Sequence, residues 1–211
     1  MSTPSVRNHR VRLSRDERRA RTRDDLVATA RQVFEQRGFH RASLEEIAEA
    51  AGYSKGAVYS NFRGKDELFL AVYAEVVDQR VADYTALTLD APTWEAGVRA
   101  VAEHQVRAAR GAPAWSALLT EFWIHASHDV AVRDALGALN DRQQEAIADM
   151  LDALVARHGL VFTVPTRDVV RASGALGRGM GLERLLAPDL PLEDVFIPAF
   201  VALNLGLTRP A

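Results

Sequence analysis

The chain of 211 residues contains no cysteine. This absence excludes a disulfide framework, a zinc finger and thiol catalysis, and it fits a reducing compartment. Long hydrophobic runs are also missing. The first 30 residues have no apolar run long enough for a signal peptide, and no later stretch approaches the roughly 18 apolar residues of a membrane span. We therefore expect a cytoplasmic protein without a membrane partner.

Strand patterns and catalytic groupings are scarce as well. The one apolar alternation, at residues 160–164, is too short to predict a sheet. No Ser/His/Asp arrangement or carboxylate pair stands out for catalysis, so we expect no enzymatic activity and no cofactor. Hydrophobic residues make up 48% of the chain and charged residues 26%, which is the balance of a globular protein.

Charge is unevenly distributed, although the formal net charge is only −2. Residues 1–67 carry 14 Lys and Arg against 10 Asp and Glu, whereas residues 68–211 carry 12 against 18. Eight arginines lie between Arg7 and Arg23. A basic front on an acidic body suggests that the N-terminal part meets a polyanion, although a solvated tail explains the charge equally well. On either interpretation we expect residues 1–14 to be a disordered basic tail.

Helical periodicity dominates the chain after Ser14 and predicts an all-α fold of about nine helices. Gly38 follows the first helix as a C-terminal glycine should, and Ser43 and Ser54 are good N-caps for the next two helices. After residue 88 the helices lengthen. The last two are expected at 165–186 and 191–207.

The second and third helices have the spacing of a helix-turn-helix. This motif needs a small residue where its helices touch, a glycine in the turn and an apolar anchor in the second helix. Ala48, Gly52 and Val58 occupy these roles at spacings of four and six residues, and Ile47 and Ala51 supply the adjoining apolar face. Together with the serine caps, the spacing predicts a helix-turn-helix near residues 43–62.

The run SLEEIAEAAGYSKGAVYSNFRGKDEL, from Ser43 to Leu68, resembles the DNA-binding region of the TetR family of transcriptional regulators. The family pattern reads Thr-apolar-x-x-Ile-Ala-x-x-Ala-Gly-x-Ser-x-Gly-x-apolar-Tyr-x-His-Phe-x-x-Lys-x-x-Leu. Here Ser43 replaces the usual threonine and Asn61 the usual histidine or tyrosine, and both keep their hydrogen-bonding ability. The resemblance implies a helix-turn-helix DNA-binding domain at 15–67 and a helical ligand-binding and dimerisation domain at 68–211.

The third helix would then be the recognition helix. Ser54 caps its N-terminus, whose positive end suits a nearby phosphate. In the major groove a lysine can donate to guanine, an asparagine can bond adenine, and a methyl group can touch thymine. The residues expected to face the groove are Lys55, Gly56, Ala57, Ser60 and Asn61.

Three further residues are expected at the DNA backbone. By the family resemblance, Tyr59, Lys65 and the hydroxyl of Ser43 contact phosphates, which fixes register without reading sequence. Alternatively, Tyr59 is a half-buried packing residue and Lys65 is a solvated side chain in the first turn of its helix.

Two other patterns carry weaker signals. The glycines at 174, 177, 179 and 181 superficially resemble a phosphate-binding loop, but the preceding strand of such a loop is missing. We expect them to allow close helix approach at a subunit interface. Glu121, His125 and His128 share one helical face and could ligate a metal ion. A polar pocket wall or an exposed stripe is the favoured interpretation, so we predict no metal site.

A ligand pocket is expected in the domain after residue 88. All three tryptophans lie there, and an apolar ligand against aromatic side chains gains from the same burial as a core residue. Placement in an ordinary core is the competing interpretation for each of them. The expected lining residues are Trp94, His104, Trp115, Phe122, Trp123 and His125.

These expectations combine into a homodimeric, ligand-responsive repressor on a pseudo-palindromic operator of double-stranded DNA. A small apolar or aromatic effector would release the DNA by shifting the fourth helix. A helical enzyme or storage protein and a sequence-tolerant architectural DNA binder are the alternatives. The two subunits would pair through the last two helices, whose apolar residues include Leu176, Met180, Leu182, Leu185, Phe196, Phe200, Val201 and Leu203.

Overall fold

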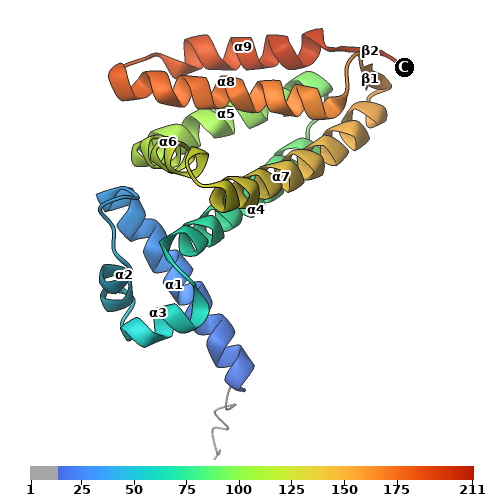
Figure 1. Ribbon diagram of the computed structural model, residues 1–211. Coiled ribbons are helices and arrows are strands. Elements are labelled where there is room, and N and C mark those ends of the chain that lie inside the picture. The colour runs from blue at the N-terminus through green and yellow to red at the C-terminus, as the bar shows by residue number, and fades with distance from the viewer. Residues whose placement is uncertain (1–13) are drawn as a thin grey trace, which may run out of the picture.

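The computed structural model describes residues 14–211, and nearly all of the tail expected at 1–14 lies outside this range. The described part is all-α apart from one short two-stranded ribbon (Figure 1). Its elements are α1 (Arg15–Arg37), α2 (Leu44–Ala50), α3 (Lys55–Asn61), α4 (Lys65–Leu89), α5 (Trp94–Gly111), α6 (Pro113–Ser127), α7 (Val130–Arg157), β1 (Leu160–Phe162), α8 (Thr166–Leu186), α9 (Leu192–Gly206) and β2 (Thr208–Pro210).

The first three helices form a small bundle whose ends are set by local signals. Ser14 and Glu17 make a reciprocal capping box at the start of α1. Gly38 follows the helix with φ of 78°, a conformation that favours glycine. Phe34 and Phe39 pack against Phe69 of α4, which fixes the bundle onto the rest of the molecule.

This first hydrophobic core extends beyond the three N-terminal helices. Besides residues of α1 to α4, it includes Leu118 and Phe122 of α6 and Leu136 of α7. Helix α4 therefore belongs to both halves of the molecule, and Figure 1 shows it running from the three-helix bundle into the helical body. The expected domain boundary between residues 67 and 68 falls near the start of this shared helix.

The second hydrophobic core lies in the body, between α4, α5, α7 and α9. Phe196, Phe200 and Val201 of α9 are buried in it, and Leu176 and Met180 of α8 pack against it. These five side chains were expected on the dimer surface, and the structure corrects that assignment because α5 and α9 pack against each other within one chain.

The strand expectation was wrong. Residues 160–162 pair antiparallel with residues 208–210, with Val161 opposite Arg209. The pairing partner lies at the far end of the sequence, where local alternation gives no signal. Helix α9 continues through Pro198. In the part of the chain that the structure describes, no helix is long and apolar enough to cross a membrane.

Candidate DNA-binding surface and ligand cavity

Helices α2 and α3 form the helix-turn-helix that the sequence predicted. The side chain of Ser43 accepts a hydrogen bond from the Glu46 amide at 3.1 Å, and that of Ser54 accepts one from the Ala57 amide at 3.2 Å. Gly52 turns the chain between the helices with φ of 73°. Val58 is fully buried, as the apolar anchor of the motif requires.

The N-terminal half of α3 presents exposed side chains. Ser54, Lys55 and Gly56 are exposed, and Ala57 is half-buried. Lys55 forms an ion pair with Glu45 of α2, and this contact raises the pKa of Lys55 and lowers that of Glu45. Contact between Lys55 and a base would have to replace this ion pair.

Two polar side chains near the end of α3 bond to their own helix. Ser60 Oγ donates to the Ala57 carbonyl oxygen at 2.8 Å, and Asn61 Nδ2 donates to the same oxygen at 2.8 Å. Both groups would have to rotate to read a base edge. The Tyr59 side chain is 50% exposed, which leaves its hydroxyl accessible to a phosphate.

Lys65, at the start of α4, is neither solvated nor free. Its ammonium group donates to the carbonyl oxygens of His40 and Ala42 at 3.0 and 3.1 Å, and it lies 4.7 Å from the centre of the Phe39 ring. The solvated-side-chain alternative is therefore wrong. In this conformation Lys65 stabilises the loop between α1 and α2.

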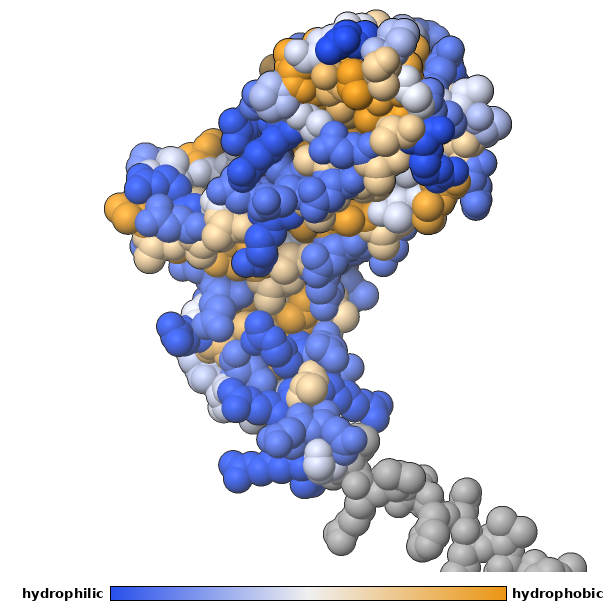
Figure 2. Space-filling model, turned by 90° about the vertical axis from the view of Figure 1, so that its right-hand side faces the viewer, coloured by the Kyte–Doolittle hydropathy of each residue, from blue (hydrophilic) through white to orange (hydrophobic). Residues whose placement is uncertain are grey.

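Arginines of α1 stabilise the other end of the recognition helix. Arg19 and Arg23 donate to the carbonyl oxygens of Ser60 and Asn61 at 3.1 and 3.0 Å, where the helix has its negative end. Figure 2 shows hydrophilic side chains covering most of the visible surface at this end of the molecule, whereas hydrophobic side chains gather toward the opposite end. Two of the N-terminal arginines, Arg19 and Arg23, thus have a structural role.

The body encloses a cavity of about 630 Å³ between α4, α5, α6, α7, α8 and α9. Four of the six expected pocket residues line it, namely Trp94, His104, Trp115 and Trp123. All three tryptophans of the chain therefore lie at the cavity wall. The volume falls within the roughly 300–1,000 Å³ of small-molecule sites.

Phe122 and His125 do not line the cavity, and this corrects their assignment. Phe122 is fully buried in the first core and stacks on Phe69 at 4.0 Å between ring centres. The Nε2 atom of His125 lies 2.7 Å from a carboxylate oxygen of Asp66 at the start of α4. Both residues are on the face of α6 that is turned toward the DNA-binding domain.

Glu121 strengthens the same contact. Its two carboxylate oxygens accept hydrogen bonds from the backbone amides of Phe39 and His40 at 3.0 and 2.9 Å. A side chain at Gly38 would collide with this carboxylate, because an ideal Cβ there would lie 2.8 Å from Oε2. Glu121 and His125 thus bind the DNA-binding domain, and His128 is exposed at the end of α6. No group of three potential metal ligands occurs among residues 14–211.

Two of the α8 glycines, Gly177 and Gly181, allow close approach within one chain. An ideal Cβ at Gly177 would lie 2.9 Å from Gln105 Oε1 of α5, and one at Gly181 would lie 2.8 Å from Ser116 Oγ of α6. Gly179 has open space around it. The structure therefore corrects the expected role of Gly177 and Gly181.

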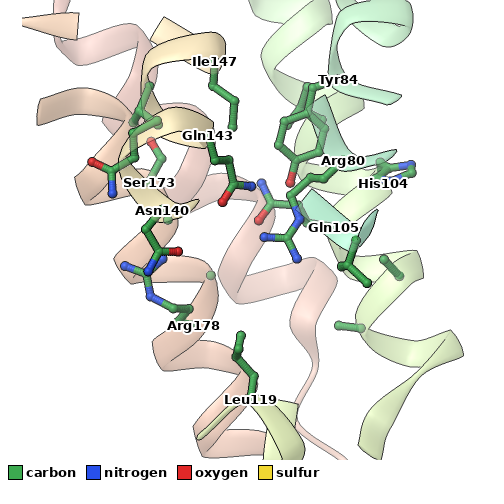
Figure 3. A pocket seen from close by; sticks show the side chains of 18 of the residues that line it. Arg80, Tyr84, His104, Gln105, Leu119, Asn140, Gln143, Ile147, Ser173 and Arg178 are labelled. Atoms are coloured by element: carbon green, nitrogen blue, oxygen red, sulfur yellow. The ribbon is translucent and has the colours of Figure 1, made fainter. Parts of the chain in front are cut away.

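Sequence reasoning missed the polar residues of the cavity other than His104. Arg80 and Tyr84 of α4 share the helical face of the buried Tyr73, spaced seven and eleven residues from it. An arginine on an apolar stripe was the signal that could have found this site. Burial raises the pKa of Tyr84 to about 12, so its hydroxyl keeps its proton even in mildly alkaline solution. Figure 3 shows the polar side chains that also line this cavity, Gln105, Asn140, Gln143 and Arg178.

Comparison with known proteins agrees with this architecture. The sequence profile described as "Bacterial regulatory proteins, tetR family" matches residues 26–72. The transcriptional activator FasR of Mycolicibacterium smegmatis is 46% identical over 71 residues, which cover 34% of this chain and 31% of FasR. The regulator BetI of Brucella canis is 24% identical over 187 residues, which cover 87% of this chain and 91% of BetI.

A solved structure shares most of the helical arrangement. The transcriptional regulator FadR of Bacillus subtilis, in complex with stearoyl-CoA, superposes with a TM-score of 0.70 at 13% identity, covering 85% of this chain and 96% of FadR. At that identity the likeness concerns the fold alone. The profile match instead covers the helix-turn-helix, and the named relatives are transcriptional regulators rather than enzymes. Residues 26–72 thus form a DNA-binding domain of the TetR family of transcriptional regulators.

Proposed function

We propose that the protein is a repressor that binds a pseudo-palindromic operator as a homodimer and releases it when a small molecule with an apolar body fills the cavity. The observation that carries this proposal is the double role of α6. One face of the helix lines the cavity, and the other holds the DNA-binding domain. A ligand that displaces α6 therefore also changes the contact between α6 and the DNA-binding domain.

The two faces of α6 are separated by the helical repeat. Trp115, Leu119 and Trp123 line the cavity at spacings of four residues. Glu121 and His125, also four residues apart, contact the loop after α1 and the start of α4. A ligand changes operator affinity only if it binds the two arrangements of α6 with different affinity. The fourth helix lines the same cavity and begins beside the recognition helix, so it moves with α6 in this proposal.

The exposed part of α3 supports a role in DNA recognition. Lys55 and Gly56 lie at its N-terminal end, where a helix entering the major groove reads bases, and Tyr59 is free to reach a phosphate. The expected contacts of Ser43, Ala57, Ser60, Asn61 and Lys65 remain part of the proposal. DNA contact would place the protein in the cytoplasm with its operator.

An uncharged outer face on the last two helices supports the homodimer. Exposed residues on α8 recur at spacings of three and four, as a helix-packing stripe requires. The matching stripe on α9 is also uncharged. Two copies would bury these stripes in a two-fold bundle, which suits a palindromic site. The α8 stripe is Ala172, Ala175, Gly179, Leu182 and Leu186, and the α9 stripe is Val195, Pro198, Ala199, Ala202 and Gly206.

Selection of DNA from a random pool by the purified protein tests this proposal. We expect an enriched pseudo-palindrome whose half-sites are about one helical turn apart, roughly 34–36 Å. A salt titration on the selected and on random DNA provides the control. Similar affinity for both at every salt concentration would favour the architectural alternative and contradict the proposal.

A further inference from the structure

We propose that the ligand of the cavity is an amphipathic anion, whose acidic head group lies between Arg80 and Arg178 and whose apolar body lies against the tryptophans. This inference rests on the proposed ligand-regulated function and adds the chemistry of the ligand. It starts from two arginines that come from different helices, α4 and α8, and line the same cavity (Figure 3).

Neither arginine has a carboxylate partner. Within residues 14–211, no Asp or Glu oxygen lies within ion-pair distance of Arg80 or Arg178, and residues 1–13 contain no acidic residue at all. Asp83 lies on the cavity wall, but its carboxylate is 3.3 Å from the Nε2 atom of His104. The two guanidinium groups therefore lack a counter-charge from the protein.

The two positive charges also act on each other. Partial desolvation lowers the pKa of Arg178, although the side chain stays exposed in part, and the positive charge of Arg80 lowers it as well. An arginine nevertheless keeps its proton in a protein, so its charge must be met by water or by an anion. A bound anion would remove the repulsion. A planar guanidinium offers paired N–H donors that match a carboxylate or a similar acidic group.

Neighbouring groups add donors to the same region. Tyr73 donates to Asn140 Oδ1 at 2.7 Å, which leaves the amide nitrogen of Asn140 available to a ligand. Burial raises the pKa of Tyr73, and the positive charges of Arg80 and Arg178 both act against this rise. The Tyr73–Asn140 pair therefore lies near both arginines. The protonated Tyr84 hydroxyl contributes another donor from α4. An acceptor-rich head group fits such a set of donors.

The rest of the cavity is suited to an apolar body. The side chains of Trp94, Trp115 and Trp123 line it together with Val98 and Ile147. Arg178 also lies over the Trp123 ring, 5.0 Å from its centre, so the charged region borders directly on the aromatic wall. A ligand that carries its acid at one end contacts both parts of the cavity at once.

A matched pair of fluorescent probes tests this inference on the full chain. Anilinonaphthalene sulfonate and N-phenylnaphthylamine share an aromatic body, and only the first carries an acidic group. Energy transfer from the tryptophans to each probe reports binding in the cavity. We expect the wild type to prefer the sulfonate. In Arg80→Gln and Arg178→Gln the sulfonate affinity should fall about tenfold or more, as loss of a charged hydrogen bond implies.

Affinity for the neutral probe should stay unchanged in these variants. Arg142→Gln removes the same charge from α7 outside the cavity and should keep the preference for the sulfonate. Arg178→Lys keeps the positive charge and should retain most of the preference for the sulfonate, even if glutamine at this position loosens the Trp123 contact. Equal affinity of the wild type for both probes, absence of sulfonate binding, or an equal loss for both probes would overturn the inference.

Operator binding measured on the same samples separates this inference from the proposed function. Sequence-specific DNA binding without a preference for the sulfonate probe would refute the anion site alone. Failure to prefer any DNA sequence would refute the regulatory function, whichever probe binds.

Discussion

Glu121→Gln tests the contact between α6 and the DNA-binding domain. The carboxylate accepts two hydrogen bonds from the loop after α1, at 3.0 and 2.9 Å. A hydrogen bond to a charged group contributes about 1.5–3 kcal/mol. The side chain is 30% exposed, so water can replace part of this interaction. Glutamine also keeps one acceptor oxygen. We therefore expect the free energy of unfolding to fall by about 1–2 kcal/mol.

Urea denaturation measures this loss, and amide hydrogen exchange locates it. Exchange should accelerate at Phe39 and His40, whose amides lose an acceptor. Glu103→Gln is the matched control, because Glu103 is exposed and its nearest cation, Arg107, is 3.9 Å away. It should change stability by less than about 0.5 kcal/mol. Unchanged stability and unchanged exchange at Phe39 and His40 in Glu121→Gln would refute the importance of this contact.

Three further predictions concern DNA contact, dimerisation and packing. Tyr59→Phe should weaken binding to all operator variants about equally, because a phosphate contact does not read sequence. Lys55→Ala should also relax base preference by about 1–3 kcal/mol at one position. Anisotropy titrations on a series of operator variants measure both effects, and an altered base preference in Tyr59→Phe would contradict its assignment to a phosphate. Leu182→Glu should shift the dimer toward monomer in light scattering, and an unchanged mass at low micromolar concentration would contradict the α8–α9 interface. Gly177→Leu should lower thermal stability, because the larger side chain would meet the Phe196 ring as well as Gln105, and a wild-type melting temperature would count against that packing.

The helix-turn-helix was predictable because its signals are local. Ser43 and Ser54 cap their helices through bonds to amides three residues away, and Gly52 adopts the left-handed turn that its residue type favours. Each signal lies within one turn of the residue it affects. Propensity and spacing therefore identified the motif before any tertiary contact was known. The DNA contacts themselves remain predictions.

The cavity was only partly predictable because periodicity does not say which neighbour each helical face meets. Phe122 and Trp123 are adjacent and both aromatic, yet one is buried in the first core and the other lines the cavity. Arg80 was missed because its position on the apolar stripe of α4 does not say whether its head group reaches solvent or a cavity. The β1–β2 pairing joins segments nearly fifty residues apart, and it depends on where the end of α9 places the chain.

Tryptophan fluorescence in the presence of operator DNA tests most directly whether the cavity and the DNA-binding domain are coupled. Every tryptophan lies at the cavity wall and none lies in the helix-turn-helix, so DNA cannot contact these side chains through the recognition helix. Since coupling between sites is reciprocal, saturating operator should change the emission and the acrylamide quenching of the tryptophans. A scrambled DNA of the same length should leave both unchanged. Identical emission and quenching with the operator fully bound, as anisotropy reports it, would contradict the coupling through α6.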